Sequence, residues 1–496
     1  MGIGKVGLHT CQDKVAGDAA GVIFAAKNTF AMQDTFILAS GAWRRLDAFR
    51  AERARCKRYV YGNQWDDLID TPEGRMTELE LIRRQGQEPL KNNILRRILR
   101  NVVGIFRAQY RTPQLTTKDS GLKGHRLKEA NRQRSEWFGE NRMEELAPRL
   151  LEEFLISGLV AVKVTGRRIQ PVTPDNFFFH SDGYDPRCHD VDLIGEVHNA
   201  SFSTLLEKFC RSADDYRRLC GIYGRDGRHR AGCRLTEVWR REVSLFAMVH
   251  DEKAATLRIV PVESSGLGHE KEDLRLHAKT AWRCRWYADD GTLLREEEPQ
   301  KNHPYIFKPY PFIDGEVHSY ISDVIDQQRY VNRLITLYDF IMRSSAKGVL
   351  LFPDESLPRG WDLQDVGDEW SRFNGVLPYR AQPGVPMPTQ VSANSTNIGI
   401  TDLLKIEMQM LEDISGVSPT LQGKLQTNST SGTLFAQQNE AAQTSLLDVI
   451  NSFTDFLREV SDKFLEVFHD VNEDGQKKTT HVMTGRYEKN IKSMNN

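Results

Sequence analysis

The 496-residue sequence lacks a long hydrophobic run. No stretch of about 18 uncharged apolar residues is present, which is the length that a membrane-spanning helix needs. The nearest candidate, residues 16–42, is interrupted by Asp18, Lys27 and Asp34, and its flanks lack the charged leader and compact apolar core of a secretion signal. We therefore predict no membrane contact and treat residues 1–40 as an N-terminal arm of uncertain structure.

Cysteine is scarce and shows no paired pattern. The seven cysteines are scattered, odd in number, and include no Cys-x-x-Cys pair. This distribution is typical of a reducing compartment and argues against a disulfide framework or a zinc ribbon. Cys188 and His189 are the one adjacent Cys/His couple, and no second pair stands at ligand spacing. We predict no metal site and no cofactor.

The sequence also lacks enzyme motifs. A phosphate-binding loop needs Gly, four residues, Gly, Lys and a hydroxyl residue, whereas residues 416–425 have the wrong spacing and end in Leu425. There is no nucleophile elbow. The adjacent carboxylates Asp66-Asp67 and Asp289-Asp290 could be imagined in a nuclease site, but such pairs in turn sequences are usually turn formers. We predict no catalytic residues and no enzymatic activity, ATP hydrolysis included.

Charge is balanced overall but uneven along the chain. A formal net charge of -1 argues against a protein that grips nucleic acid over its whole surface. Residues 91–134 nevertheless hold 12 Lys and Arg against 2 Asp and Glu, a local balance of 12 − 2 = +10. Such a block is most often a solvated or partner-facing surface, and otherwise an anion-binding one.

The composition is typical of a folded protein, and the length of 496 residues predicts more than one packing unit. Hydrophobic residues make up 39% and charged residues 27% of the sequence. Apolar spacing predicts helices over 41–61, 93–109, 123–138 and 143–157. Short β-like runs follow between 159 and 287, and Asp289-Asp290-Gly291 is a hairpin signal. This part of the chain is predicted to be α+β.

The last third alternates helices with irregular chain. Helices are predicted over 319–346, 398–414 and 433–471, the first about 40 Å long at about 1.5 Å per residue. A stretch rich in Pro and Gly, predicted to be non-helical, separates the first two helices, which we expect to run antiparallel. Apolar residues cover more than one face of this pair, so neighbouring copies in a cyclic oligomer would bury them. The alternative is a helical hairpin packed within one chain.

Several short fragments between about residues 40 and 470 are distinctive when taken in order. They are Tyr-Gly-Asn-Gln-Trp-Asp at 61–66, residues 87–94, Pro-Asp-Asn-Phe-Phe-Phe at 174–179 followed by 185–192, Tyr-Pro-Phe at 310–312 with Gly315 and 323–332, and residues 413–423 with 429–432 and Gln437-Gln438. Each fragment is weakly specific alone, but together and in this order they resemble the portal family of tailed double-stranded DNA bacteriophages, of the podovirus type.

The resemblance implies an α+β portal fold that assembles as a ring oligomer, a dodecamer in this family. Its parts would follow one another as N-terminal arm 1–40, α+β wing 41–317, first stem helix 318–346, β-rich clip 347–397, second stem helix 398–417, tunnel loop 418–431, long wing and crown helix 432–471, and polar C-terminal tail 472–496.

The resemblance also implies a function. The ring would be the channel at one capsid vertex for packaging, retaining and ejecting double-stranded DNA, and so a part of the virion that assembles in the host cytoplasm. It would dock the terminase large subunit, later a head-completion or tail adaptor protein, and would contact the major capsid protein or scaffold.

Three sets of residues are candidates for these roles. In the loop, a single charge among small polar residues suits DNA that must slide, because strong phosphate contacts would stall movement. Each set also has an alternative without function. The loop residues could simply be exposed, the stem carboxylates could lie on a solvated helix face, and the clip residues could form a small local core. The candidates are Lys424, Gln426, Thr427 and Asn428 for the channel-lining tunnel loop, Asp402, Glu407 and Glu412 for an acidic stem lining, and Trp361, Trp370 and Arg372 for partner docking on the clip.

A second function from another class stays open. The basic block 91–134 could make the chain a structural, oligomeric nucleic-acid-binding protein that forms no channel. Salt-insensitive ring assembly with weak DNA binding would favour the portal. Steep, salt-dependent DNA affinity of a monomer would favour the alternative.

Overall fold

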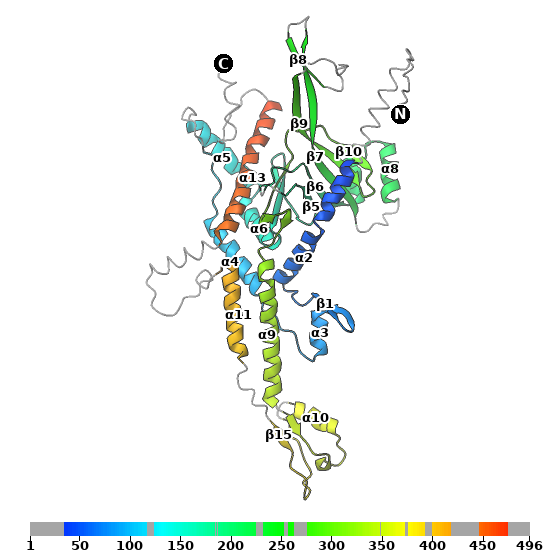
Figure 1. The fold of residues 1–496 in the computed structure, drawn as a ribbon, viewed down its shortest axis with the longest axis vertical. Helices are drawn as coiled ribbons and strands as arrows, with labels where there is room; N and C mark the ends of the chain where they lie inside the picture. The colour runs from blue at the N-terminus through cyan, green and yellow to red at the C-terminus, as the bar shows by residue number, and fades with distance from the viewer. Residues whose placement is uncertain are drawn as a thin grey trace, which may run out of the picture. The chain divides into compact units, whose positions relative to one another are not determined.

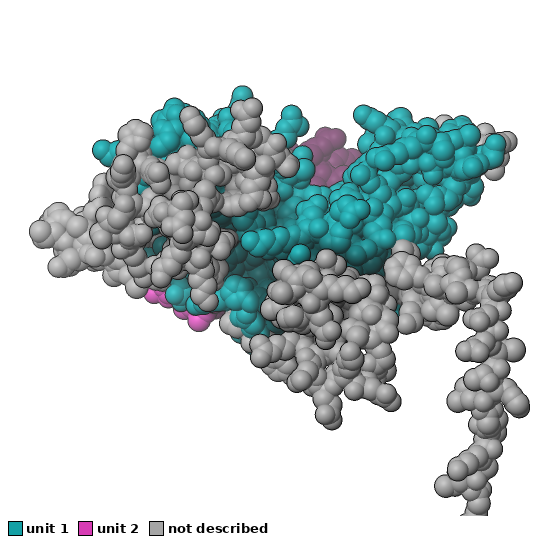
Figure 2. Space-filling model, turned by 90° about the horizontal axis from the view of Figure 1, so that it is seen from above, with its two compact units in different colours: residues 1–54, 103–319, 447–496 teal, residues 55–102, 320–446 magenta. Residues whose placement is uncertain are grey.

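The computed structural model divides the chain into two compact units, coloured separately in Figure 2. Unit 1 comprises Met1–Ala54, Val103–Ser319 and Leu447–Asn496, and unit 2 comprises Arg55–Val102 and Tyr320–Leu446. The structure describes residues 34–116, 124–183, 185, 187–224, 232–251, 256–261, 275–347, 349–372, 375–391, 399–417 and 446–474. Both helices and strands are abundant, which confirms the α+β class. Within the described residues, no helix is long and apolar enough to cross a membrane.

Unit 1 contains a six-stranded antiparallel sheet with the order β10-β9-β7-β6-β5, in which β8 also pairs with β7 (Figure 1). The predicted strands are all present, and the turn at Asp289-Asp290-Gly291 joins β9 to β10 as expected. Gly291 has a φ of +84°, which favours glycine at this turn. The strands are β5 Phe177–His180, β6 Leu193–Ala200, β7 Cys233–Asp251, β8 Thr256–Pro261, β9 Arg275–Ala288 and β10 Leu293–Glu296.

A three-stranded antiparallel sheet, with the order β11-β3-β4, completes the β structure around the core of unit 1. Strand β3 is buried along most of its length, which explains its run of small and β-branched apolar residues. Aromatic rings fill the interior, with Phe177 packed against Tyr305 and Phe307. The strands are β3 Leu159–Thr165, β4 Arg168–Val172 and β11 Tyr305–Pro309, and a small hairpin joins β12 Phe312–Ile313 to β13 Glu316–Val317.

The helices of unit 1 bury one apolar face each. On α13, Phe453 packs against Phe106 and Phe154, and Phe464 packs against Trp137. The predicted helix 433–471 is therefore present from Leu447 onward, and its earlier residues lie outside the described part of the chain. The helices are α5 Gly124–Glu140, α6 Met143–Ser157, α7 Phe202–Phe209, α8 Ala213–Tyr223 and α13 Leu447–Asp474.

The N-terminal arm predicted over residues 1–40 overlaps the folded part of the chain, which already includes residue 34. Residues 34–45 are helical, and Ala39 and Ala42 are buried in the core of unit 1. Thr35 is fully buried, and its hydroxyl accepts hydrogen bonds from Arg240 and Arg285 of the large sheet at 3.0 and 3.3 Å. Residues 34–40 thus belong to the folded unit, and residues 1–33 are outside the described residues.

Unit 2 is built mainly on two long helices, α9 and α11. A small hairpin of β1 and β2 leads into α3, whose N-cap Thr77 forms a capping box with Glu80. The division between the units falls inside α2 and α4. The elements are α2 Asp47–Tyr61, β1 Leu68–Thr71, β2 Gly74–Thr77, α3 Glu78–Arg84, α4 Ile94–Gln109, α9 Ser322–Lys347 and α11 Ile400–Ser415.

The chain between α9 and α11 is not the non-helical, β-rich segment that we expected. It contains the nine-residue helix α10, which Asp362 caps by accepting from the backbone N–H of Asp365 at 2.7 Å. Its described β structure is one antiparallel pair of three-residue strands. The elements are β14 Val349–Leu351, the 3₁₀ turn η2 Asp354–Ser356, α10 Leu363–Ser371 and β15 Thr389–Val391.

Candidate functional site

Helices α9 and α11 lie side by side in unit 2 (Figure 1). The Tyr320 hydroxyl, just before α9, donates to the carbonyl of Ser415 at the end of α11. The start of one helix therefore meets the end of the other, which confirms the predicted antiparallel arrangement. Leu411 and Ser415 of α11 are buried in this unit.

A second face of α11 is apolar but uncovered. Ile406, Met410 and Ile414 are spaced by four residues, so they form one stripe along the helix. Each keeps about half of its surface exposed, with fractions of 49, 48 and 47%. Large apolar side chains aligned in this way mark a surface that another molecule covers.

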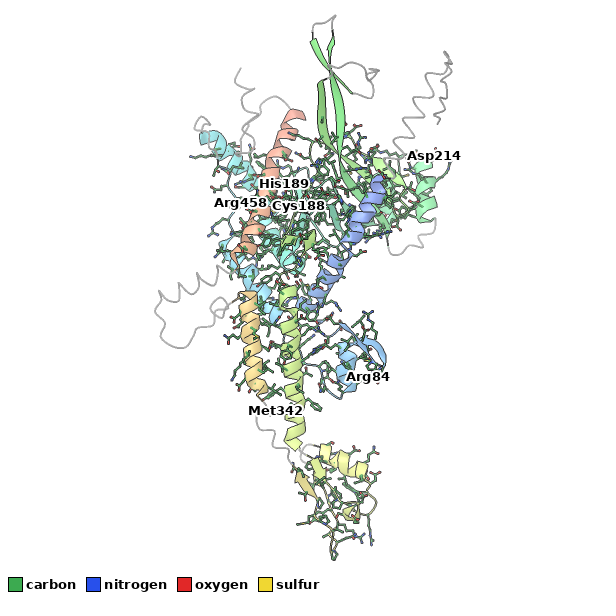
Figure 3. All side chains as sticks on the ribbon, in the orientation of Figure 1. Arg84, Cys188, His189, Asp214, Met342 and Arg458 are labelled. Carbon is green, nitrogen blue, oxygen red and sulfur yellow. The ribbon has the colours of Figure 1, made fainter. Side chains whose placement is uncertain are left out.

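Helix α9 carries a similar stripe. Tyr330, Leu337 and Phe340 are exposed and lie within about 80° of one another around the helix, because spacings of seven and three residues fall about 20° and 60° short of whole turns. Met342, labelled in Figure 3, is half-exposed further along the same helix. The two long helices of unit 2 thus each present an apolar face in addition to the face they bury.

Buried amides fix the chain before α4 to the middle of α9. The Gln328 side chain is fully buried, and its Oε1 accepts from the backbone N–H groups of Ile94 and Leu95 at 3.0 and 3.2 Å. Asn332 accepts from the N–H of Asn92 at 3.0 Å and donates to Gln64 Oε1 at 2.7 Å. These bonds satisfy backbone donors at the start of α4 that have no partner within the helix.

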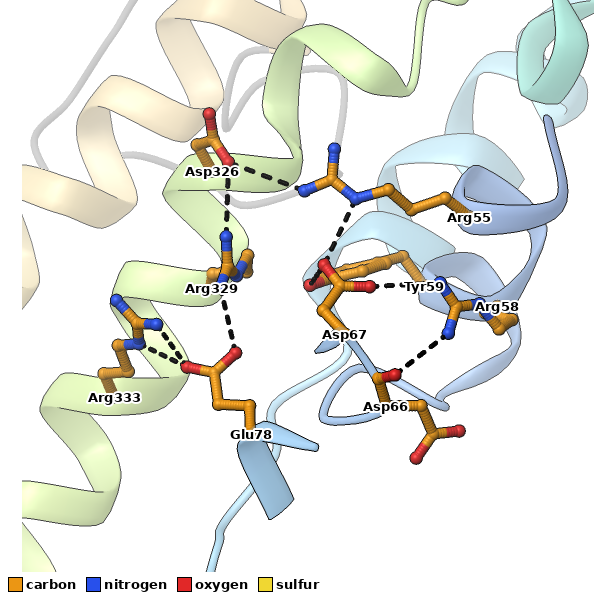
Figure 4. A network of polar contacts seen from close by, with 9 residues as sticks. All are labelled: Arg55, Arg58, Tyr59, Asp66, Asp67, Glu78, Asp326, Arg329 and Arg333. Carbon is orange, nitrogen blue, oxygen red and sulfur yellow. Dashed lines mark hydrogen bonds and ion pairs between the residues drawn. The ribbon is translucent and has the colours of Figure 1, made fainter. Parts of the chain in front are cut away.

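Carboxylates reinforce the same region (Figure 4). Glu78 at the start of α3 is buried and accepts from Arg329 at 3.0 Å and from Arg333. Asp67 accepts from Arg55 at 3.2 Å, from Arg58 at 3.0 Å and from the Tyr59 hydroxyl at 2.8 Å.

The Asp66-Asp67 pair therefore has a structural explanation. Arg55 and Arg58 neutralise Asp67 within the same unit, and Asp66 takes part through its carbonyl oxygen, which accepts from Arg58 at 3.3 Å. This is the arrangement of an ion pair that holds a turn against a helix. The other pair also forms a turn, in which Asp290 accepts from the N–H of Thr292 at 2.9 Å.

Comparison with known families identifies the chain. The family model described as phage P22-like portal protein matches residues 39–485, which include both long helices and the segment between them. The chain belongs to the P22-like portal family. No individual curated protein matches it with significance. Membership confirms the resemblance seen in the sequence and makes this protein part of a phage virion.

The three stem carboxylates of this portal protein do not share one face. Asp402, Glu407 and Glu412 are spaced by five residues on α11, so successive members point about 140° apart. Asp402 and Glu412 fall on the polar side of the helix, where Asp402 pairs with Lys405 at 3.2 Å. Glu407 falls between the buried face and the apolar stripe. The three carboxylates therefore form no single stripe along α11, and their role as an acidic lining stays a prediction.

The structure describes only some of the remaining candidate site residues. Lys424, Gln426, Thr427 and Asn428 lie outside the described residues. Trp361 and Trp370 are half-buried in the segment between α9 and α11, where Val366 is the most deeply buried of the described apolar side chains. Arg372 is largely exposed and pairs with Glu369 at 3.0 Å. The docking role of all three residues stays a prediction.

The basic block 91–134 is not one surface. Arg134 is buried in unit 1, where it donates to Ser461 and Asn131, both at 3.0 Å. Arg132 is exposed but paired with Glu129 and Glu136. Arg97 and Arg100 of α4 are exposed. The described residues of the block therefore do not form one continuous cationic surface, and the nucleic-acid-binding alternative stays untested.

Cys188 and His189, labelled in Figure 3, do not form a recognisable metal site. Cys188 is buried, and burial raises the pKa of its thiol to about 12, which disfavours the thiolate that binds metals. In the part of the chain that the structure describes, the grouping with ligand spacing lies elsewhere, at Glu196, His198 and Glu237.

That grouping in the large sheet of unit 1 was not predicted from the sequence. The ligand atoms lie within 4.8 Å of one another. However, Lys163 already donates to both oxygens of Glu237 at 2.6 and 2.5 Å, and His198 lies 2.9 Å from the same carboxylate. Glu196 and Glu237 face each other across β6 and β7, so they would repel without a nearby cation. Lys163 supplies that cation, and the cluster is explained as a buried ion network.

The network makes unit 1 sensitive to acid. Burial alone would raise the pKa of Glu237, but hydrogen bonds from His198 and Lys163 and the charge of Lys163 lower it from 4.5 to about 2. A carboxylate with a lowered pKa stabilises the fold above its ordinary pKa and loses that contribution as pH falls toward 2. We expect a loss of about 3 kcal/mol between pH 5 and pH 2. Urea unfolding measured against pH checks this, with Glu237→Gln as the comparison. The difference in free energy of unfolding between the two proteins should shrink as the pH falls from 5 to 2. A constant difference would contradict the lowered pKa of Glu237.

Proposed function

We propose that the chain forms a closed ring of about twelve copies around a channel at one capsid vertex, through which double-stranded DNA is packaged, retained and later ejected. The pair of uncovered apolar stripes on α9 and α11 is the observation that carries the proposal. The stripes are different surfaces of one unit, so contact between the α9 stripe of one copy and the α11 stripe of the next is head-to-tail. Repeated head-to-tail contacts close into a ring when the rotation allows it.

The channel wall would be polar and only weakly attractive to DNA. On α11, the side that neither packs on α9 nor carries the apolar stripe holds Asp402, Lys405, Gln409 and Glu412. Mixed charges repeated around a ring disfavour tight phosphate binding. DNA can therefore slide along such a wall without being held. We propose this side of the helix as the stem lining, together with Lys424, Gln426, Thr427 and Asn428 of the loop.

The segment between the stem helices would be the docking platform for the terminase large subunit and then for a head-completion or tail adaptor protein. Apart from Val366, it buries little apolar surface, and Val376 and Met387 are 77 and 69% exposed. Trp361, Trp370 and Arg372 are of the types that anchor interfaces. Nucleotide hydrolysis would reside in the terminase, and the portal itself would catalyse no reaction. Contact with the major capsid protein or scaffold and assembly in the host cytoplasm belong to the same proposal.

Electron microscopy of the purified chain tests the proposal. Class averages should show rings with a central opening wide enough for duplex DNA, across a broad range of salt concentration. A monomer that forms no ring at any salt concentration and binds DNA with a steep salt dependence would instead support the non-channel nucleic-acid-binding alternative.

A further inference from the structure

Helix α4 has an exposed face that carries three arginines. Arg97, Arg100 and Arg107 are exposed, whereas Ile98 and Val102 on the opposite side are fully buried. At about 100° per residue, the three arginines lie within about 80° of one another around the helix. Because α4 is one continuous helix, their Cα atoms extend over about 15 Å along its axis. They therefore form one cationic stripe, which we call the arginine face.

No carboxylate neutralises the arginine face within the described part of the chain. Residues 91–116 contain six Lys and Arg but no Asp or Glu, and none of the three arginines has an ion pair with another described residue. Several exposed arginines of other helices pair with a carboxylate of their own helix, as Arg132 does with Glu136 and Arg217 with Asp214. Helix α4 lacks this compensation, so a negative charge that neutralises its face must come from another molecule.

The arginine face is unfavourable for a helix that meets only water. Arg97 lies in the first turn, where the helix dipole disfavours positive charge and where no acidic residue is present. Arg100 follows at a spacing of three residues, at which like charges repel. Gly104 lies on the same face, and glycine destabilises a helix interior relative to alanine. A Cβ at this position would meet nothing within 4 Å, so Gly104 leaves room for another molecule to approach the backbone closely.

The composition of the arginine face favours phosphate over a protein surface. Its other members are Asn101, Gly104 and Ala108, so it lacks the large apolar anchor that a protein interface uses. Guanidinium groups bind phosphate oxygens through paired hydrogen bonds, and amides such as that of Asn101 also donate to phosphates. Duplex DNA carries a phosphate about every 3.4 Å along each strand, so a stripe of about 15 Å can face several of them.

We propose that the arginine face of α4 binds the phosphate backbone of duplex DNA without regard to base sequence. The inference rests on the proposed function for the choice of polyanion, because a portal channel brings duplex DNA to the protein. It adds a DNA contact that is separate from the stem lining and the tunnel loop. Three arginines in each copy make few phosphate contacts, so binding by one copy is weak and depends on salt concentration.

DNA binding by a glutamine variant tests this contact. Arg97→Gln with Arg100→Gln and Arg107→Gln retains good helix formers but removes three positive charges. Fluorescence anisotropy with a short labelled duplex should show an affinity lower by about tenfold or more at low salt. The slope of log affinity against log salt concentration should become less steep by about 3, or about 1 for each lost phosphate contact. A second duplex of unrelated sequence should give the same result.

The matched control is Arg132→Gln with Arg217→Gln and Arg458→Gln. It removes the same net charge from three exposed helical arginines, each of which already pairs with a carboxylate. This variant should bind the duplex nearly as the unchanged chain does. Lysine at the three positions of the arginine face should preserve the salt slope, because the charges remain. Circular dichroism verifies that each variant folds.

Each outcome decides for or against the contact. Equal duplex affinity and salt slope in the glutamine variant and the unchanged chain would overturn it. Equal losses in the glutamine variant and the matched control would also overturn it, because net charge alone would then explain them. A glutamine variant that keeps duplex binding but loses binding of poly-glutamate would assign the face to an acidic protein partner instead.

Ring formation separates this inference from the proposed function. The glutamine variant should form rings as the unchanged chain does in electron microscopy, because the stripes of α9 and α11 are not altered. Absence of rings from the unchanged chain would overturn the proposed function. The duplex titration would still decide whether the arginine face binds DNA, because it compares variants of the same chain in the same state.

Discussion

Replacing Met410 by aspartate is expected to convert assembled rings into folded monomers. Met410 lies at the centre of the α11 stripe, between Ile406 and Ile414, and is 48% exposed within one chain. In the ring it would be buried against the next copy, where an unpaired carboxylate costs several kcal/mol. The same charge would then be placed at every interface of the ring. Native mass spectrometry should therefore detect monomer where the unchanged chain gives rings.

The control for this experiment is Ile313→Asp. Ile313 is an exposed apolar residue of similar size on strand β12 of unit 1, and it belongs to neither apolar stripe. This variant should assemble normally, because the proposed interface consists of the α9 and α11 stripes and does not include Ile313. Intact rings of Met410→Asp would contradict an interface at the α11 stripe, and disruption by both changes would point to a general effect of added charge.

Replacing Gln328 by leucine is expected to release the start of α4 from α9. Leucine has a similar volume but makes no hydrogen bond, so the buried N–H of Leu95 loses its acceptor, while the N–H of Ile94 and Oδ1 of Asn332 each keep one of two partners. An unsatisfied buried group costs about 1–3 kcal/mol, and together with the two lost secondary hydrogen bonds we expect about 3 kcal/mol in total. Hydrogen exchange at the amides of Ile94 and Leu95 should accelerate about a hundredfold.

The neighbouring residue provides the control for this second experiment. Gln327 is only partly buried, and its Oε1 makes no hydrogen bond in the described structure. Gln327→Leu should therefore leave exchange at Ile94 and Leu95 nearly unchanged. Equal exchange in Gln328→Leu and Gln327→Leu would show that the amide contacts do not hold this segment.

Strong helical periodicity made the long helices predictable. Apolar residues recur at helical spacing throughout α4, α9 and α11, and the ends of these helices fall close to the expected positions. Helix α10 was missed because its nine residues lie in a segment interrupted by Pro and Gly. The signal that could have found it is Asp362 followed three residues later by Asp365, which is a capping box.

Contacts between distant residues could not be predicted from local pattern. The helix at 34–45 is held at Thr35 by Arg285, which is 250 residues away. The sequence marked segments 87–94 and 323–332 as family fragments, but only the structure shows that they contact each other through Gln328 and Asn332. The cluster around Glu237 is equally invisible, because Lys163 and His198 come from different strands.

The stem lining shows the limit of reading residue types without helix geometry. Asp402, Glu407 and Glu412 were grouped because all are acidic and lie on one helix. A spacing of five residues turns each by about 140°, so three such residues cannot form a stripe. The stripe that the helix does form is apolar, at a spacing of four, and it leads to the interface proposed here.

The mass of the assembled protein, measured by native mass spectrometry at neutral pH, tests the central claim most directly. The claim is that the uncovered stripes of α9 and α11 join copies of this chain into a closed ring. Twelve copies of 56.8 kDa predict a single species of about 680 kDa, with neighbouring ring sizes also compatible with closure. A stable monomer or dimer at high concentration, with no larger closed species at any salt concentration, would contradict it.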